Sequence, residues 1–212
     1  MRRHVIGNRM NQKYDPATYL VLANMLIPHD CDGAERVLRD GIHNFPRAPG
    51  FHLLLARVHQ SRGHYLEAFL EYQWELLRTG AERTEGADAA RCCAQLMKDP
   101  KAAVQLSELL IAVEEMQRNP RSARKRVQQI ISREGEKPLL LLYEAECAQN
   151  SGDSKAARDM YQRLIELDPA FVPALVQLSE LLQQAGRQHE AEQLLSRARE
   201  IDSAHWRLQP AP

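Results

Sequence analysis

The sequence predicts an all-α protein, and three observations support this prediction. Apolar residues recur at three- and four-residue steps along most of the chain, as in Leu178, Leu181 and Leu182. No segment shows the sustained apolar and polar alternation of a strand, and the Asn-Gly dipeptide of tight hairpins is absent from the sequence. Glycine and proline stand between the helical runs rather than inside them.

Length and composition narrow the possible classes of protein. The 212 residues carry 28 basic and 28 acidic side chains, so the overall charge gives no reason to expect nucleic acid or an anionic membrane as a partner. The longest apolar runs, 19–27 and 138–143, reach at most half of the roughly 18 residues that span a bilayer. Residues 1–14 lack the apolar centre of a signal peptide, and 4 cysteines are too few for a disulfide framework. We expect no membrane span and a reducing, cytoplasmic setting.

The chain repeats a helical hairpin with a period of about 34 residues. The stretches RGHYLEAFLEYQWELLRTG (62–80) and SGDSKAARDMYQRLIELDP (151–169) share a turn glycine, then an alanine, then a tyrosine at the same spacing. The alanine column, in five units, is Ala34, Ala68, Ala123, Ala157 and Ala191, and the large column four residues on is Leu38, Tyr72, Val127, Tyr161 and Leu195. Two antiparallel helices that cross closely accept only a small side chain at the crossing, and a large one fills the gap a turn later.

This frame orders the chain into segments. They are an N-terminal segment (1–14), two hairpins (15–82), an insertion (83–103), three hairpins (104–205) and a C-terminal tail (206–212). Within the insertion we expect a short helix from Asp88 to Lys98, ended by Asp99 and Pro100. The first helix of the third repeat then begins about a turn early. Two roles of the insertion stay open, a functional hinge and a tolerated surface insertion.

A hairpin of this length with this pattern of small and large residues resembles the tetratricopeptide repeat. The resemblance covers 15–82 and 104–205, although tryptophan never opens a repeat and the closing proline survives only as Pro46 and Pro169. It implies an α-solenoid, a right-handed superhelix of stacked antiparallel hairpins that bury one continuous core. It also implies a non-catalytic protein–protein interaction scaffold or assembly factor.

In such repeats the first helices line a concave groove, so their outward sides form the candidate binding site for a partner segment. The site residues are Tyr19, Leu26, Arg57, Gln60, Glu108, Glu115, Glu146, Asn150, Glu180 and Gln184. This surface is apolar toward the N-terminus and acidic to amide-rich toward the C-terminus, which favours a partner peptide or helix with basic and apolar residues. The Lys/Asn/Arg clamp of the family members that bind chaperone tails is missing.

The residues that carry chemistry predict no enzyme activity, no metal and no cofactor. No Walker loop, HExxH, GxSxG or CxxC motif is present. His52 and His59 lie seven residues apart on the packing side of one helix, a spacing that brings no third metal ligand with it. Cys92 and Cys93 suit a short packed helix better than a reactive site.

Two further functions remain open. The basic stretch 118–126 can hold phosphates, but no aromatic residues interleave it and the outer side of a second helix is normally solvated, so nucleic acid is the less favoured partner. The chain can also be a structural subunit of a homo-oligomer. We expect uncovered apolar surface around Leu20, Leu26 and Ile27, and such patches usually mark contacts with another chain.

At the other end of the solenoid only a short tail follows the fifth hairpin. Its apolar residues, Trp206 and Leu208, can fold back over Leu194 and Ile201. They cannot cover a whole helical flank, because a solenoid end usually needs a capping helix.

Overall fold

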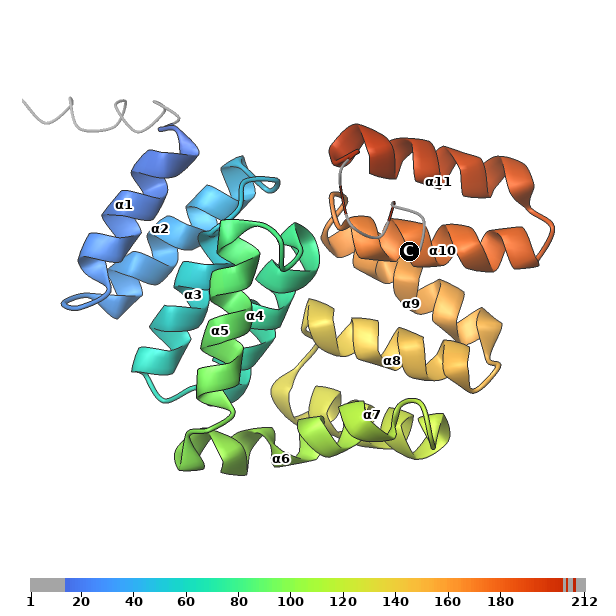
Figure 1. Ribbon diagram of the computed structural model, residues 1–212, viewed down its shortest axis with the longest axis horizontal. Coiled ribbons are helices and arrows are strands. Elements are labelled where there is room, and N and C mark those ends of the chain that lie inside the picture. The colour runs from blue at the N-terminus through green and yellow to red at the C-terminus, as the bar shows by residue number, and fades with distance from the viewer. Residues whose placement is uncertain (1–13, 204, 206–207, 209–212) are drawn as a thin grey trace, which may run out of the picture.

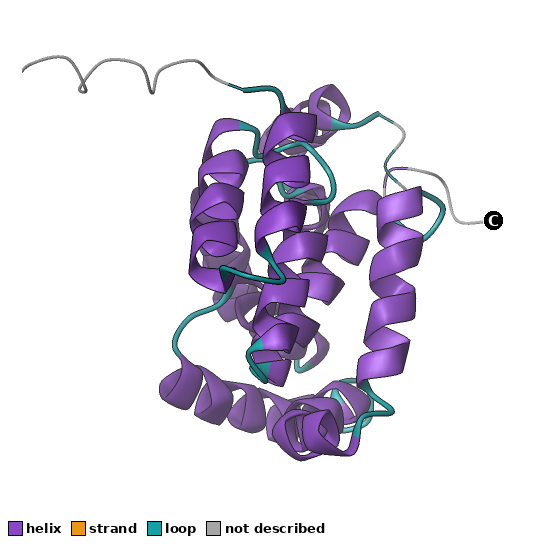
Figure 2. Ribbon diagram, turned by 90° about the vertical axis from the view of Figure 1, so that its left-hand side faces the viewer, coloured by secondary structure: helices purple, strands orange, loops and turns teal. Residues whose placement is uncertain are grey.

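The computed structural model describes residues 14–203, 205 and 208. Figure 1 and Figure 2 show that the described residues form helices and loops without a strand, which confirms the all-α prediction. The helices are α1 (Pro16–Leu26), α2 (Cys31–Asn44), α3 (Phe51–Ser61), α4 (Tyr65–Thr79), α5 (Thr84–Leu96), α6 (Pro100–Glu115), α7 (Pro120–Glu134), α8 (Pro138–Asn150), α9 (Ser154–Leu167), α10 (Val172–Gln184) and α11 (Gln188–Ile201).

Helix ends follow local side-chain chemistry. The Asp15 side chain accepts a hydrogen bond from the Thr18 N–H, and Asp153 does the same for Ala156, so each satisfies a backbone donor that the first turn leaves free. The turn glycines Gly63 and Gly152 have φ angles of 75° and 83°, a region that side chains disfavour. This backbone requirement explains the glycines that set the repeat frame.

The helices pair into antiparallel hairpins, which are α1/α2, α3/α4, α6/α7, α8/α9 and α10/α11. All five residues of the alanine column are fully buried, as expected where two helices cross closely. Tyr72 and Tyr161, from the large column, are also buried. The α-solenoid of stacked hairpins is therefore confirmed.

The insertion contributes a helix whose bounds differ from those expected. Helix α5 spans Thr84–Leu96 and contains Asp88, which was expected to cap it. Asp99 instead caps α6 by accepting from the Lys101 N–H, so α6 begins at Pro100, a turn early as expected. Helix α5 packs along α4 and has no second helix of its own to form a hairpin.

Glycines also occur inside helices, contrary to the expectation that they only separate them. A Cβ atom on Gly86 of α5 would lie 1.9 Å from the Gly80 carbonyl oxygen, and one on Gly41 of α2 would lie 2.1 Å from the Phe51 ring. Close approach between neighbouring elements requires these glycines and outweighs their low helix propensity.

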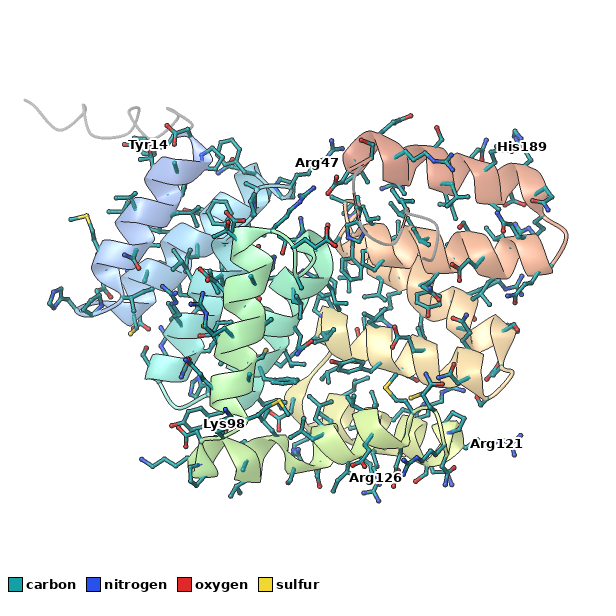
Figure 3. All side chains as sticks on the ribbon, in the orientation of Figure 1. Tyr14, Arg47, Lys98, Arg121, Arg126 and His189 are labelled. Carbon is teal, nitrogen blue, oxygen red and sulfur yellow. The ribbon has the colours of Figure 1, made fainter. Side chains whose placement is uncertain are left out.

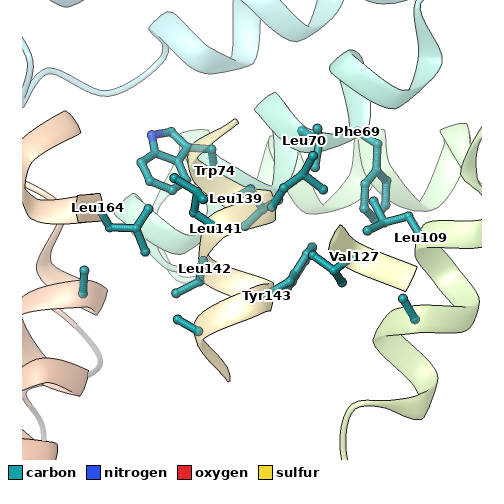
Figure 4. Close-up of a cluster of buried hydrophobic side chains, with 14 of the residues drawn as sticks. Phe69, Leu70, Trp74, Leu109, Val127, Leu139, Leu141, Leu142, Tyr143 and Leu164 are labelled. Carbon is teal, nitrogen blue, oxygen red and sulfur yellow. The ribbon is translucent and has the colours of Figure 1, made fainter. Parts of the chain in front are cut away.

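Helix α4 lies at the centre of the molecule. It contacts α3, α5, α6, α8 and α10, so the last three hairpins bend round and meet the second one (Figure 1). The Trp74 ring of α4 stacks on Phe171, with ring centroids 3.9 Å apart and an angle of 14° between the ring planes. Figure 4 shows Trp74 and Leu70 of α4 beside Leu139 of α8 in one buried cluster.

Candidate partner-binding site

The inner side of the C-terminal hairpins is partly covered by the chain itself. Leu139 and Leu142 of α8 are buried in the same apolar cluster as Leu70 of α4. Val172 and Val176 of α10 are buried in a second cluster. The first halves of these two helices are therefore unavailable to a partner.

Polar contacts also join the C-terminal hairpins to α4 and the elements beside it, and we call this contact region the junction. Arg78 donates hydrogen bonds to the Asp168 carboxylate and to the Pro46 carbonyl, and it is largely buried. Lys137 Nζ lies 3.6 Å from Glu67 Oε1, which links the start of α8 to α4. Arg83 and Asp202 form a further ion pair at 2.7 Å. His205 donates from its ring Nε2 to the Leu77 carbonyl over 3.1 Å.

The second half of α10 is open on one side, and α8 is open only at its end. Asn150, Glu180 and Gln184 are exposed and Glu146 is half-buried. Figure 1 shows α8 and α10 running in the same direction, so these residues lie toward the same end of the two helices. The Asn150 Nδ2 group donates to the Met116 carbonyl over 3.2 Å, which ties α8 to α6. Four of the ten predicted site residues therefore lie on this open part.

Two carboxylates of the predicted site, Glu108 and Glu115, are paired within their own hairpin. Arg133 of α7 donates to Glu108 over 2.9 Å, and Arg126 of α7 donates to Glu115 over 3.2 Å. The negative charge of the inner side is therefore partly neutralised at α6. Glu146 and Glu180 lie farther along the solenoid.

Three of the four N-terminal members of the predicted site have structural contacts. Tyr19 packs edge-on against Phe45 at a centroid distance of 6.0 Å, and Leu26 is packed against the core of α1 to α3. Gln60 accepts a hydrogen bond of 2.8 Å from the Tyr72 hydroxyl, and Arg57 is exposed on α3. A role of these four residues in partner binding stays a prediction.

The hydrogen bond between Gln60 and Tyr72 was not foreseen from the sequence. Its counterpart in the fourth hairpin joins the Tyr161 hydroxyl to Gln149 over 2.9 Å. Both glutamines lie three residues before the turn glycine. That shared column was the signal that could have revealed the bond.

The two histidines of α3 face α4. His52 Nδ1 lies 2.6 Å from Glu71 Oε2, and this hydrogen bond, opposing the effect of burial, lowers the pKa of Glu71. Burial lowers the pKa of His59 because the charged imidazole loses hydration. His59 is 8% exposed, and its Nδ1 atom has no hydrogen-bond partner. Within the described residues no group of three or more side chains is placed to hold a metal ion.

The cysteines are free thiols in ordinary packing environments. Burial raises the pKa of Cys93 to about 12 and that of Cys147 to about 11, so neither is a ready nucleophile. Cys93 faces α4 and accepts a hydrogen bond from the Gln73 amide.

The basic stretch on α7 is only partly available to phosphates. Arg124 pairs with Asp153 at 2.9 Å, and Arg126 pairs with Glu115. Arg121 lies at the outer end of α7 and is exposed (Figure 3). The intramolecular pairs leave a smaller cationic surface than the sequence suggested.

At the N-terminal end the exposed apolar face differs from the expected one. Leu20, Leu26 and Ile27 are partly buried against α2 and α3, so their expected exposure is wrong. Val21 and Met25 are instead 60% and 69% exposed. The equivalent columns are buried in α3, α8 and α10, each of which follows a second helix, and no such helix precedes α1 among the described residues.

At the C-terminal end, Leu208 packs against the cluster that also holds Leu194 and Ile201, as expected. Trp206 lies outside the described residues. Among the described helices none is long and apolar enough to cross a membrane.

Comparison with known proteins identifies the family. A tetratricopeptide repeat model matches residues 151–209, and a second tetratricopeptide repeat model matches residues 116–170. Together with the five hairpins and their small and large columns, these matches support a tetratricopeptide repeat protein. Its fold generally serves protein–protein interaction rather than catalysis.

Several solved structures are similar to this chain. YrrB, described as a TPR protein with an unusual peptide-binding site, is 17% identical with a TM-score of 0.40, covering 92% of this chain and 90% of YrrB. MamA from Desulfovibrio magneticus RS-1 is 10% identical with a TM-score of 0.38, covering 90% and 97%. TTC0263, a thermophilic TPR protein of Thermus thermophilus, is 16% identical with a TM-score of 0.39, covering 92% and 95%. At this level of similarity they define neither the curvature nor the partner of this chain. No curated protein matches it.

Proposed function

We propose that the protein is a non-catalytic scaffold or assembly factor that binds a segment of a partner protein on the open parts of α8 and α10. The observation that carries this proposal is the row of polar side chains left uncovered beyond the junction with α4. Glu180 and Gln184 are exposed, and Glu180 forms no salt bridge within the described residues. First helices of this family present such side chains to a concave surface.

The charge of this surface favours a basic partner segment. Glu146 and Glu180 occupy the same column of successive hairpins and give the open part a negative potential. Apolar side chains are scarce there, because Leu181 and Leu182 point into the core. The surface therefore supplies charge and amide hydrogen bonds rather than an apolar anchor.

Charge reversal tests this surface. A partner captured by the wild-type protein is titrated against the double variant Glu146→Lys and Glu180→Lys, with Glu166→Lys and Glu192→Lys on second helices as the matched control. We expect the first pair to weaken binding about three- to tenfold, more at low ionic strength, because exposed charges act through a screened potential. Unchanged binding, or equal loss in the control, contradicts the proposal.

Self-association through α1 is a second candidate function, favoured by its exposed apolar face. Val21 and Met25 lie on the side that a neighbouring hairpin would cover, and α1 carries no charged residue. Sedimentation across a concentration series tests this function. Val21→Glu with Met25→Glu should abolish any dimer, whereas Asn24→Glu, an exposed position on the same helix, should leave it intact. A wild-type chain that stays monomeric at all concentrations excludes the candidate.

Nucleic acid remains the less favoured partner, and salt-dependent retention of RNA or DNA through 118–126 is its test. We propose the cytoplasm as the location, a setting supported by the four free thiols.

A further inference from the structure

Helix α1 has an apolar face that no other helix covers within the described part of the chain. Val21, Leu22 and Met25 on this face are 60%, 43% and 69% exposed. Together with Tyr14 and Thr18 they line a shallow trough of about 560 Å³. In Figure 1 this helix lies at the opposite end of the molecule from α10 and α11. Another chain can therefore contact α1 without touching the surface proposed above.

Helix α6 is a second first helix with an exposed apolar residue, but its face differs from that of α1 in charge. Ile111 of α6 occupies the column of Leu22 and is 43% exposed. The column of Met25 holds Glu114 in α6, which is also exposed. Helix α1 contains no Asp, Glu, Lys or Arg, whereas every other described helix contains at least one. The face of α1 therefore favours an apolar, uncharged contact.

The segment before α1 does not have the residues by which second helices cover the next first helix. All five second helices have a large apolar residue in the column of Leu38, and four of them have Ile or Leu in the column of Ile42. Ile42 packs against the core that α1, α2 and α3 share. The same two columns, 34 residues earlier, fall on His4 and Asn8. This mismatch favours a cover for α1 that comes from another chain.

We propose that α1 pairs with α1 of a second copy of this chain, the two helices running antiparallel about a two-fold axis near Val21 and Leu22. A two-fold contact buries both exposed faces at once and sets residues near the axis beside their own copies. A charged residue there would repel itself, and α1 has none.

Two features favour the antiparallel direction. Helix α2 meets α3, and α9 meets α10, in opposite directions, so a helix that covers a first helix runs against it in this fold. Antiparallel pairing also sets the positive end of each helix dipole beside the negative end of the other. In this arrangement Thr18 lies opposite Met25 of the second copy.

The pairing deepens the second candidate function, self-association, and rests on it. Because α1 lies far from α10, the dimer carries two separate copies of the surface proposed for partner binding. A partner with two suitable segments would then bind with avidity.

Cysteine cross-linking of the full chain tests the pairing and its direction. Val21→Cys and Leu22→Cys lie next to the axis, so each should form a disulfide-linked dimer on oxidation in vitro. Met25→Cys should cross-link at least about tenfold less, because the two copies of residue 25 lie roughly 10 Å apart along the helices, too far for a disulfide. The wild-type chain is the control for the native thiols, and circular dichroism checks the fold of each variant.

The outcomes separate this pairing from the functions proposed above. Cross-linking at 21 and 22 that exceeds cross-linking at 25, with a wild-type dimer in sedimentation, supports the antiparallel pair. Equal or stronger cross-linking at 25 overturns it, while self-association through α1 in another direction can still stand. A monomeric wild type overturns both and leaves partner binding at α8 and α10 untouched. A dimer that forms only after removal of 1–13 also overturns the proposal and assigns the face of α1 to the chain's own N-terminal segment.

Discussion

The hairpins α3/α4 and α8/α9 share one internal design but occupy opposite environments. Both have a turn glycine, a buried alanine, a buried tyrosine and a tyrosine–glutamine hydrogen bond at the same positions. Yet α4 is buried on nearly all sides, whereas α9 has an exposed outer face. The residues that form a hairpin therefore do not decide where it lies in the solenoid.

The difference lies in four outer columns of the second helix. In α4 they hold Leu66, Phe69, Leu70 and Trp74, each 4–5% exposed. In α9 they hold Lys155, Arg158, Asp159 and Arg163, and the other second helices are polar at all four columns as well. Only α4 can bury this face, so it is the helix around which the last hairpins close.

Truncation in these columns tests the comparison with the largest expected effect. Trp74→Ala should lower the free energy of unfolding by about 3–5 kcal/mol, because it removes a buried ring and leaves a cavity at the junction. The matched change Arg163→Ala should stay within about 0.5 kcal/mol, since that residue forms an exposed ion pair with Glu136. Urea unfolding followed by circular dichroism measures both.

Similar losses in the two variants would contradict the difference between the outer faces. Trp74→Phe is the control for size, and it should recover part of the stability because a ring still faces Phe171.

The repeat fold could be predicted from the sequence because its signals are local. Ala68 and Ala157 predict where two helices that follow each other in the sequence cross, and Gly63 and Gly152 predict the turn between those helices. The closure around α4 depends on a contact of another kind. Trp74 contacts Phe171, which lies 97 residues later in the sequence, and no repeat column predicts that pairing.

The candidate site was predictable only in part for the same reason. Asn150, Glu180 and Gln184 are exposed on the helices and columns that the repeat frame assigns to the inner side. The frame could not show that the first halves of α8 and α10 are covered, or that Arg126 and Arg133 neutralise carboxylates of α6. The apolar residues in the outer columns of α4 were the feature of the sequence from which the burial of the outer face of α4 could have been predicted.

Overpacking tests the feature that both hairpins share. Ala68→Leu and Ala157→Leu should each destabilise the protein by about 1–3 kcal/mol, because both alanines are fully buried where two helices cross. Chemical unfolding of the two variants is the measurement. A neutral result at either site would show that the crossing is looser than the burial indicates.

Removal of the shared hydroxyl gives a smaller effect. Tyr72→Phe and Tyr161→Phe each delete one hydrogen bond to a glutamine on the first helix, and each should cost about 0.5–1.5 kcal/mol. The two losses should be similar, since burial and bond length are similar. A loss in only one variant would mean that the hairpins are not equivalent inside, and the double variant should be additive because the sites lie in separate hairpins.

The smallest expected effect concerns pH, at a column where α3 has His59 and α8 has Ala148. Burial lowers the pKa of His59 from its usual 6.5, against the opposing influence of Glu71, Glu35 and Glu67. The unfolded chain therefore binds a proton near pH 6.5 that the folded chain does not bind, so stability should fall as the pH drops below 6.5 toward the lowered pKa. His59→Gln removes this titration, and unfolding between pH 7.5 and about 5 should then show a shallower decline than wild type. Equal slopes in the two proteins would mean that His59 is solvated in the folded state.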